Sequence, residues 1–107
     1  MLIAFTTTGS KEEALALART AIENSHAVCA QIDGPVTSVY RWQGKVEEAQ
    51  EYRVAFKCLP DQLAGLEARV LRAHSYETPE WIVVSSEHVG EKYLNWAIET
   101  STPARFS

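Results

Sequence analysis

The sequence predicts an α+β fold in which strands and helices follow one another as β-α-β-β-α-β, with one more helix at the end. Three observations predict it. β-favouring runs stand at residues 2–8 and 81–84, two apolar stripes recur at helical spacing between them, and two long β-favouring runs meet at the turn Gln43–Gly44. The 107 residues suffice for a single domain, residues 1–107, with no linker or internal repeat.

The first strand leads into a helix that carries a capping signal. Residues 2–8 favour β structure and contain no helix cap, so they are expected to form a strand. Ser10 and Glu13 have the spacing of a capping box, in which Ser10 accepts a hydrogen bond from the Glu13 amide and the Glu13 carboxylate reaches back to the Ser10 amide. Apolar residues at helical spacing then predict a helix that ends at residues 24–26.

Two long strands are expected next, residues 27–42 and residues 45–59. Pro35 has no amide hydrogen to donate to a neighbouring strand, so Gly34–Pro35 is expected at a bulge or on a sheet edge. At about 3.3 Å per residue, each arm of this hairpin spans about 45–50 Å, whereas strands are typically about 5–6 residues long. Two helices of ordinary length cannot cover an element of this size.

The pairing of these two strands has two possible registers. A plain two-residue turn places Cys29 opposite Cys58, but it mixes polar and apolar residues on one face. One bulged residue near residues 47–49 aligns the apolar residues instead. It places Ala30 and Ile32 on the same face as Cys58, Phe56 and Val54. We expect the bulged register, because a buried face determines how strands pair.

A second helix, a fourth strand and a last helix complete the predicted order. Pro60–Asp61 begins the second helix, and Thr78–Pro79 interrupts the chain after it. Residues 81–84 form a nearly continuous apolar run, which predicts a strand buried on both faces. Gly90 precedes the last helix, and Pro103 follows its end. The complete order is the split βαβ pattern of a ferredoxin-like α/β sandwich.

The far end of the hairpin predicts self-association. It carries Val39, Tyr40 and Trp42, which are costly to leave exposed to water. A second copy of the chain, added strand to strand at the sheet edge, is expected to cover them. Tyr40 and Trp42 are the expected interface residues, because aromatic side chains anchor protein interfaces.

Composition and motifs argue against several classes of protein. Lys and Arg number 10 against 14 Asp and Glu, and the net charge of -4 argues against a nucleic-acid partner. No apolar run approaches the roughly 20 residues of a membrane span, and residues 1–5 are too short for a signal peptide. A cytoplasmic location with no membrane partner is therefore expected. The chain has no nucleophile elbow, HExxH motif or phosphate-cradling loop, so neither an enzyme nor an organic cofactor is expected.

Several motifs occur together and in a particular order. They are Ala27-Val28-Cys29-Ala30-Gln31-Ile32, the Tyr-x-Trp-x-Gly-Lys motif of residues 40–45, residues 51–57, the His-x-Tyr-x-x-Pro-Glu motif of residues 74–80, and residues 93–96. In order and spacing, over nearly the whole chain, they resemble the CutA divalent-cation-tolerance family. The resemblance implies a single CutA-like domain that forms a homotrimer through its long hairpins, similar in fold and assembly to PII signalling proteins. It also implies a role in the tolerance of copper and other divalent cations.

The resemblance further implies metal binding, and three residues are candidate ligands of Cu(II) or another divalent cation. His74 and Glu80 flank the predicted loop before the fourth strand, and imidazole with carboxylate suits copper or zinc. Cys29 offers a thiol. Alternatively, His74 caps the C-terminus of the second helix, and Cys29 packs as a small apolar residue. Some family members have a Cys where this chain has Thr6, and a second His where it has Ala73.

A second function stands beside divalent-cation tolerance. By analogy with PII-like trimers, Tyr76, Glu77 and Trp96 are candidate residues of a cleft between subunits. Such a cleft would bind a small ligand or a partner loop, with no direct metal role. An RNA-binding domain of the same fold is disfavoured, because the middle strands lack the exposed aromatic and basic pattern of such domains.

Overall fold

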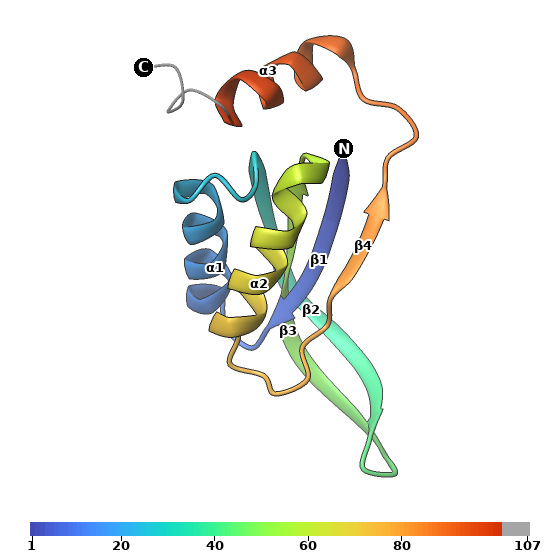
Figure 1. Ribbon diagram of the computed structural model, residues 1–107. Coiled ribbons are helices and arrows are strands. Elements are labelled where there is room, and N and C mark those ends of the chain that lie inside the picture. Colours follow the sequence, from blue (N-terminus) through green and yellow to red (C-terminus); the bar gives the residue numbers. More distant parts are fainter. Residues whose placement is uncertain (102–107) are drawn as a thin grey trace.

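The computed structural model describes residues 1–101 and confirms the predicted α+β order (Figure 1). The strands are β1 (Leu2–Thr8), β2 (Cys29–Trp42), β3 (Lys45–Cys58) and β4 (Ile82–Ser85). The helices are α1 (Lys11–Glu23), α2 (Leu63–Ala73) and α3 (Glu91–Ser101), and one 3-10 turn, η1 (Pro60–Gln62), leads into α2. None of the helices described is long and apolar enough to cross a membrane. Pro103, expected after the last helix, lies outside the described residues.

The four strands form one antiparallel sheet in the order β2-β3-β1-β4, so β2 and β4 are its edges. Helices α1 and α2 lie side by side on one face of the sheet, and α3 lies beyond the end of the sheet where β1 begins (Figure 1). The distal half of the β2–β3 hairpin extends past the rest of the molecule. The opposite face of the sheet is covered by no helix within residues 1–101.

The core lies between the sheet and helices α1 and α2. Its largest fully buried apolar side chains come from β3 and α2, and they are Phe56, Val54, Leu66 and Val70. The buried residues of α1 are mainly small ones, Ala14, Ala18 and Ala21, so this helix can lie close to the sheet. Each large apolar side chain buried in this way stabilises the fold by about 1.5–3 kcal/mol.

Strands β2 and β3 pair so that the apolar residues share one face of the sheet, as the sequence pattern predicted. The facing pairs are Ala30 with Phe56 and Ile32 with Val54. Cys29 lies opposite Lys57, so the side chains of Cys29 and Cys58 belong to opposite faces of the sheet. Both cysteines are free thiols.

The bulge that sets this register lies in β2, so its predicted position near residues 47–49 of β3 is wrong. Gly34 and Pro35 together face the single residue Tyr52. Gly34 has a φ of 152°, and a Cβ there would come within 2.8 Å of the Tyr52 ring and 2.9 Å of the Glu51 carbonyl oxygen. The close approach of β3 therefore requires glycine at this position. Because β2 is an edge strand, the prolyl nitrogen removes no central ladder hydrogen bond.

Strand β4 differs from the prediction because it lies at the other edge of the sheet. Burial on both faces is wrong for the single chain, since Ile82 and Val84 are 54% and 43% exposed. They lie beside Phe5 and Ile3 of β1 on the face that α1 and α2 do not cover. Val83 points to the opposite face and packs against the core. One apolar strip is therefore left open on the sheet.

Candidate functional site around His74

His74 is the C-cap residue of α2, and its imidazole is completely buried. Nδ1 lies 3.0 Å from the backbone nitrogen of Tyr76, and Nε2 lies 2.8 Å from the carbonyl oxygen of Thr7. Because a backbone N–H can only donate, Nδ1 must accept, and the proton of the neutral ring is therefore on Nε2, which donates to Thr7. Both nitrogens are engaged, so neither has a lone pair free for a metal ion.

The carboxylate of Glu13 holds the residue after His74 against α1. Oε2 accepts from the backbone N–H of Ser75 at 2.9 Å, and Oε1 accepts from the Ser75 hydroxyl at 2.8 Å. Oε2 also lies 3.8 Å from Nδ1 of His74. One half of the predicted capping box is confirmed, since Ser10 Oγ accepts from the Glu13 N–H at 3.1 Å. The other half is wrong, because the carboxylate makes its two hydrogen bonds to Ser75 instead of returning to Ser10.

The phenol of Tyr76 connects this loop to the long hairpin. Its hydroxyl donates to Oε2 of Glu51 at 2.9 Å, and Glu51 lies on β3 next to the bulge. The Tyr76 ring is centred 5.0 Å from the imidazole of His74. Burial, the hydrogen bond to Glu51 and the negative charges of Glu51 and Glu13 raise the pKa of Tyr76 to about 12. The phenol therefore stays protonated near neutral pH and remains a donor.

The structure does not bring the three predicted metal ligands together. His74 contacts Thr7, whereas Cys29 lies opposite Lys57, four residues further along the sheet. At about 3.3 Å per residue these two levels are about 13 Å apart. Glu80 is exposed, ahead of β4. Within residues 1–101, no three His, Cys, Asp or Glu side chains form a group able to hold a metal ion.

Cys29 has a different neighbour, Tyr93 of α3. Burial and the adjacent Cys29, which is hydrogen-bonded to the phenol, raise the pKa of Tyr93. The ammonium group of Lys57 lies 6.0 Å from the centre of the same ring, at the limit of a cation–π contact. Cys29 therefore contacts α3 at the end of the sheet, but it is only half-buried and lies outside the apolar core in which the alternative interpretation placed it. Burial raises the pKa of the Cys58 thiol, which keeps it protonated.

The predicted aromatic residues lie at separate places on the molecule. Tyr40 and Trp42 project from one face of the distal hairpin, 44% and 53% exposed. Tyr76 lies beside Glu51, whereas Trp96 belongs to α3 beyond the other end of the sheet. A cleft that contains both Tyr76 and Trp96 therefore requires two copies of the chain.

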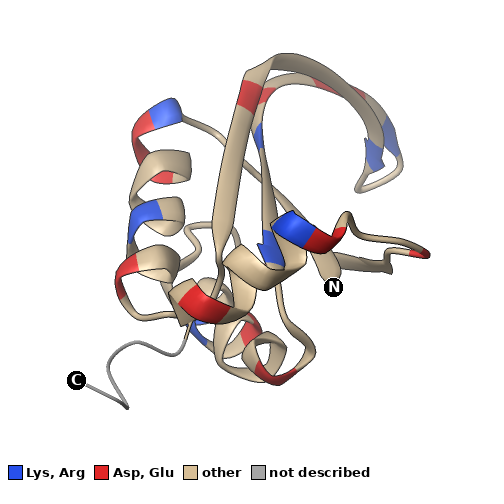
Figure 2. Ribbon diagram, turned by 90° about the horizontal axis from the view of Figure 1, so that it is seen from above, with Lys and Arg blue, Asp and Glu red and all other residues tan. Residues whose placement is uncertain are grey.

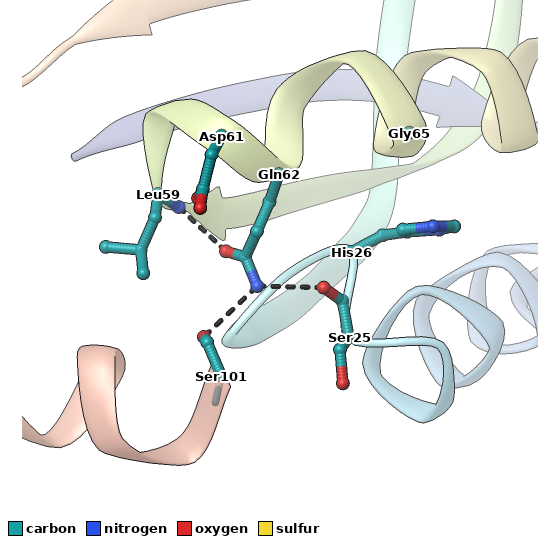
Figure 3. A pocket seen from close by; sticks show the side chains of 7 residues that line it. All are labelled: Ser25, His26, Leu59, Asp61, Gln62, Gly65 and Ser101. Atoms are coloured by element: carbon teal, nitrogen blue, oxygen red, sulfur yellow. Dashed lines mark hydrogen bonds between the residues drawn. The ribbon is translucent and has the colours of Figure 1, made fainter. Parts of the chain in front are cut away.

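A hollow of about 280 Å³ lies between the loop after α1, the turn η1 and the end of α3 (Figure 3). Gln62, which the sequence did not single out, joins these three elements. Its Oε1 accepts from the Leu59 N–H at 2.8 Å, and its Nε2 donates to the Ser25 carbonyl at 2.9 Å and to the Ser101 hydroxyl at 3.1 Å. Its amide is therefore engaged within the chain. A Gln two residues after Pro60, where its side chain can reach back to the free N–H of the residue before the first helical turn, is the signal that could have found it.

These features define a class of ferredoxin-like α+β protein, in which two helices cover one face of the sheet and the long β2–β3 hairpin extends past the rest of the domain. The chain belongs to the CutA1 divalent ion tolerance protein family, whose sequence profile matches residues 2–100. This match covers all the strands and nearly all of α3. The resemblance of the sequence motifs to that family is thereby confirmed.

Individual relatives agree with this membership. The divalent-cation tolerance protein CutA of Thermus thermophilus is 34% identical over 95 residues, which are 89% of this chain and 92% of that protein. The protein CutA of Mus musculus is 32% identical over 93 residues, 87% of this chain and 52% of the mouse protein. The crystal structure of CutA1 from Ehrlichia chaffeensis superposes with a TM-score of 0.90 at 25% identity and covers 94% of both chains.

Proposed function

We propose that this chain acts in the tolerance of divalent cations, Cu(II) among them, as a homotrimer that binds rather than catalyses. The relatives that carry the name divalent-cation tolerance protein support the role. A binding function is favoured because the buried imidazole of His74 is held by two backbone groups and is not free to act as a base. The cytoplasmic location expected from the composition stays a prediction.

One observation carries the proposal of assembly: the open face of the sheet is apolar. Ile82 and Val84 are about half exposed there, next to Phe5 and Ile3. The distal hairpin adds further exposed apolar side chains, namely Val39, Tyr40, Trp42 and Val46. Burial of such surface is favourable by about 25 cal/mol per Å². Figure 2 shows acidic and basic residues interspersed along the helices and the hairpin. Because no segment carries charges of one sign alone, we assign association to contact between apolar surfaces and not to attraction between opposite charges.

We propose a cation site between protomers on the same surface. Zinc and copper sites in proteins use three or four protein ligands. Within residues 1–101, a single protomer has no group of three His, Cys, Asp or Glu side chains that could hold a metal ion. Among the predicted ligands, Glu80 is the exposed one and stands at the edge strand β4, where a neighbouring copy would pack. We therefore assign Glu80 to the proposed site, with the other ligands supplied by a second protomer. Three copies rather than two are proposed because of the family resemblance.

Native mass spectrometry with and without added Cu(II) tests both parts of the proposal. We expect trimers in both samples and bound copper in the second. Monomers would overturn the assembly and the cation site together. Trimers that stay free of copper would leave the assembly standing and overturn the proposed binding of Cu(II).

A matched pair of variants tests the assignment of Glu80. Glu80→Gln removes one carboxylate charge, and Glu77→Gln removes another from the same loop, where Glu77 is also exposed. We expect Glu80→Gln to lower the affinity for Cu(II) by about tenfold, whereas Glu77→Gln leaves it unchanged. Isothermal titration calorimetry on both trimers measures the difference. Equal affinities of the two variants would remove Glu80 from the site.

A further inference from the structure

We propose that the hollow between the loop after α1, the turn η1 and the end of α3 binds the ammonium group of a small organic amine, with the Asp61 carboxylate as its counter-ion (Figure 3). This inference is independent of the proposed function. The hollow has a volume of about 280 Å³, close to the lower end of the roughly 300–1,000 Å³ typical of ligand pockets. Its size therefore suits a ligand of a few non-hydrogen atoms.

Two helices end at this hollow, and both direct their negative ends towards it. Ser25 follows the C-cap residue of α1, and Ser101 is the last residue of α3. A helix C-terminus carries a partial charge of about −0.5, which a basic side chain in the last turn would offset. Neither α1 nor α3 has a basic residue in its last turn. The negative potential of two helix ends therefore favours a cation in the hollow.

Asp61 adds a full negative charge to the lining of the hollow. Among residues 1–101 its carboxylate forms no hydrogen bond and no ion pair. The effect of this charge extends to the buried thiol of Cys58, whose pKa is raised. Burial is the main cause of that rise, the N-terminal ammonium opposes it, and Asp61 adds to it. Asp61 thus acts on this end of the molecule without a cationic partner of its own.

Gln62 holds the walls of the hollow in place and is not itself free to bind a ligand. Its Oε1 accepts from the Leu59 N–H, and its Nε2 donates both hydrogens, one to the Ser25 carbonyl and one to the Ser101 hydroxyl. The Ser101 hydroxyl in turn donates to the Ala97 carbonyl at 2.8 Å. A carbonyl oxygen has two lone pairs, so that of Ser25 can accept one more hydrogen bond. This oxygen and the carboxylate are the acceptors that we assign to the ligand.

The other walls of the hollow offer apolar contacts. Leu59 lies on one side of it, and the ring of His26 extends towards Gly65 of α2 (Figure 3). A Cβ at Gly65 would come within 2.9 Å of this ring, so the glycine makes room for it. The carbon chain of an amine can therefore pack against Leu59 and His26 while its ammonium group faces the acceptors.

This combination of groups fits an ammonium ion better than a metal ion or an anion. Asp61 is the single carboxylate of the hollow, whereas zinc takes three or four protein ligands and calcium about 6–8 oxygens. An anion would be repelled by Asp61 and by both helix ends. The three N–H donors of an ammonium group match a carboxylate and a neighbouring carbonyl oxygen.

NMR titration of the ¹⁵N-labelled protein with n-butylammonium chloride tests the site, and 1-butanol is the uncharged ligand of matched size. Ionic strength is held constant with sodium chloride, because salt screens charges near the surface. We expect saturable shifts of the backbone amides of Ser25, Asp61 and Gln62 at millimolar n-butylammonium, and at least about tenfold weaker binding of 1-butanol. No saturable shift up to about 100 mM, shifts centred elsewhere, or equal binding of the two ligands would overturn the proposal.

Two variants test Asp61 as the counter-ion. Asp61→Asn removes the carboxylate charge from the hollow. Glu67→Gln removes a charge from a side chain that is also exposed but lines a different hollow on α2, and the new amide oxygen can still accept from Trp81. We expect Asp61→Asn to weaken the binding of n-butylammonium by about tenfold and Glu67→Gln to leave it unchanged. An Asp61→Asn protein that binds n-butylammonium as tightly as the wild type would show that Asp61 is not the counter-ion, and the proposal would be wrong.

Discussion

Thr6 lies on the core face of strand β1, and its hydroxyl makes no hydrogen bond within residues 1–101. The residue is completely buried opposite Val54, and its Oγ1 has no partner within the described residues. Two residues further along the same face, Thr8 Oγ1 donates to the carbonyl of Ser10 at 2.7 Å. A buried hydroxyl without a partner costs about 1–3 kcal/mol, whereas a satisfied one contributes about 1 kcal/mol. These two threonines therefore affect stability in opposite directions.

Replacement of each threonine by valine tests this difference. Thr6→Val removes the unsatisfied hydroxyl at nearly constant shape and should raise the free energy of unfolding by about 1 kcal/mol. Thr8→Val removes a satisfied hydroxyl and should lower it by about 1 kcal/mol. Urea denaturation at equal protomer concentration measures both, since association contributes to the apparent stability. A Thr6→Val protein less stable than the wild type would show that the Oγ1 finds a partner in solution.

Gly65 is the third residue of α2, a helical position where glycine is normally unfavourable, and the ring of His26 occupies the space that a side chain would fill there. A Cβ at Gly65 would lie 2.9 Å from Cδ2 and 2.9 Å from Nε2 of His26. We expect Gly65→Ala to stabilise the protein by about 1 kcal/mol only when His26 is also replaced by alanine. In the wild-type background the contact should cancel or reverse this gain. Thermal unfolding of the four proteins of this double-mutant cycle measures the coupling, and strict additivity would contradict the steric explanation.

At the scale of the element, the hairpin shows what a sequence pattern determines and what it leaves open. The alternation of apolar residues predicts which residues of β2 and β3 share a face, and this prediction is confirmed. Any single extra residue along either strand produces the same faces, so the pattern alone cannot position the bulge. Its actual position depends on the approach of Tyr52 and Glu51 to Gly34, a contact between strands. Such contacts are not visible in local sequence.

Gly34 and Gly44 provide a test of this bulge. Both have a positive φ, 152° and 80°, but a Cβ at Gly44 would meet nothing within 4 Å. Gly44→Ala should cost about 1 kcal/mol through backbone strain alone. Gly34→Ala should cost more than about 2 kcal/mol, because the added methyl group collides with the Glu51 carbonyl and the Tyr52 ring. Urea unfolding of the two variants compares these costs, and equal values would mean that β3 moves away without penalty.

The loop after α2 also shows which contacts of the candidate site local sequence cannot predict. Spacing correctly predicts that His74 ends the helix, because this is a local property. Its partner Thr7 is 67 residues away in the sequence, and the Glu13–Ser75 pair is separated by 62 residues. Local spacing assigned the Glu13 carboxylate to Ser10, whereas the fold offers it two donors on Ser75. The part of the site that could not be predicted is thus the part made by tertiary contacts.

The whole molecule is elongated, with extents of 52 × 27 × 21 Å, because the hairpin outgrows the α1–α2 layer. A single chain therefore has two kinds of exposed apolar residue. Ile82 is on the open face of the sheet, and Leu15 is on the outer face of α1, 54% and 43% exposed. Only the first belongs to a continuous apolar strip, together with Val84 and the neighbouring residues of β1. Isolated exposed apolar residues are ordinary, whereas continuous ones indicate an interface.

A charged residue introduced at Ile82 or at Leu15 tests which of the two positions lies in an interface between copies. Ile82→Asp should dissociate the assembly, because a carboxylate buried between copies loses its hydration without a compensating partner. Leu15→Asp introduces the same side chain at a similarly exposed site and should leave the assembly intact. Since neither residue is buried in the single chain, both variants should keep the far-UV circular dichroism of the wild type. Sedimentation velocity reads the subunit number of each. If Ile82→Asp remained assembled, the open face of the sheet would not be the contact between copies, and the distal hairpin with Tyr40 and Trp42 would have to carry the association alone.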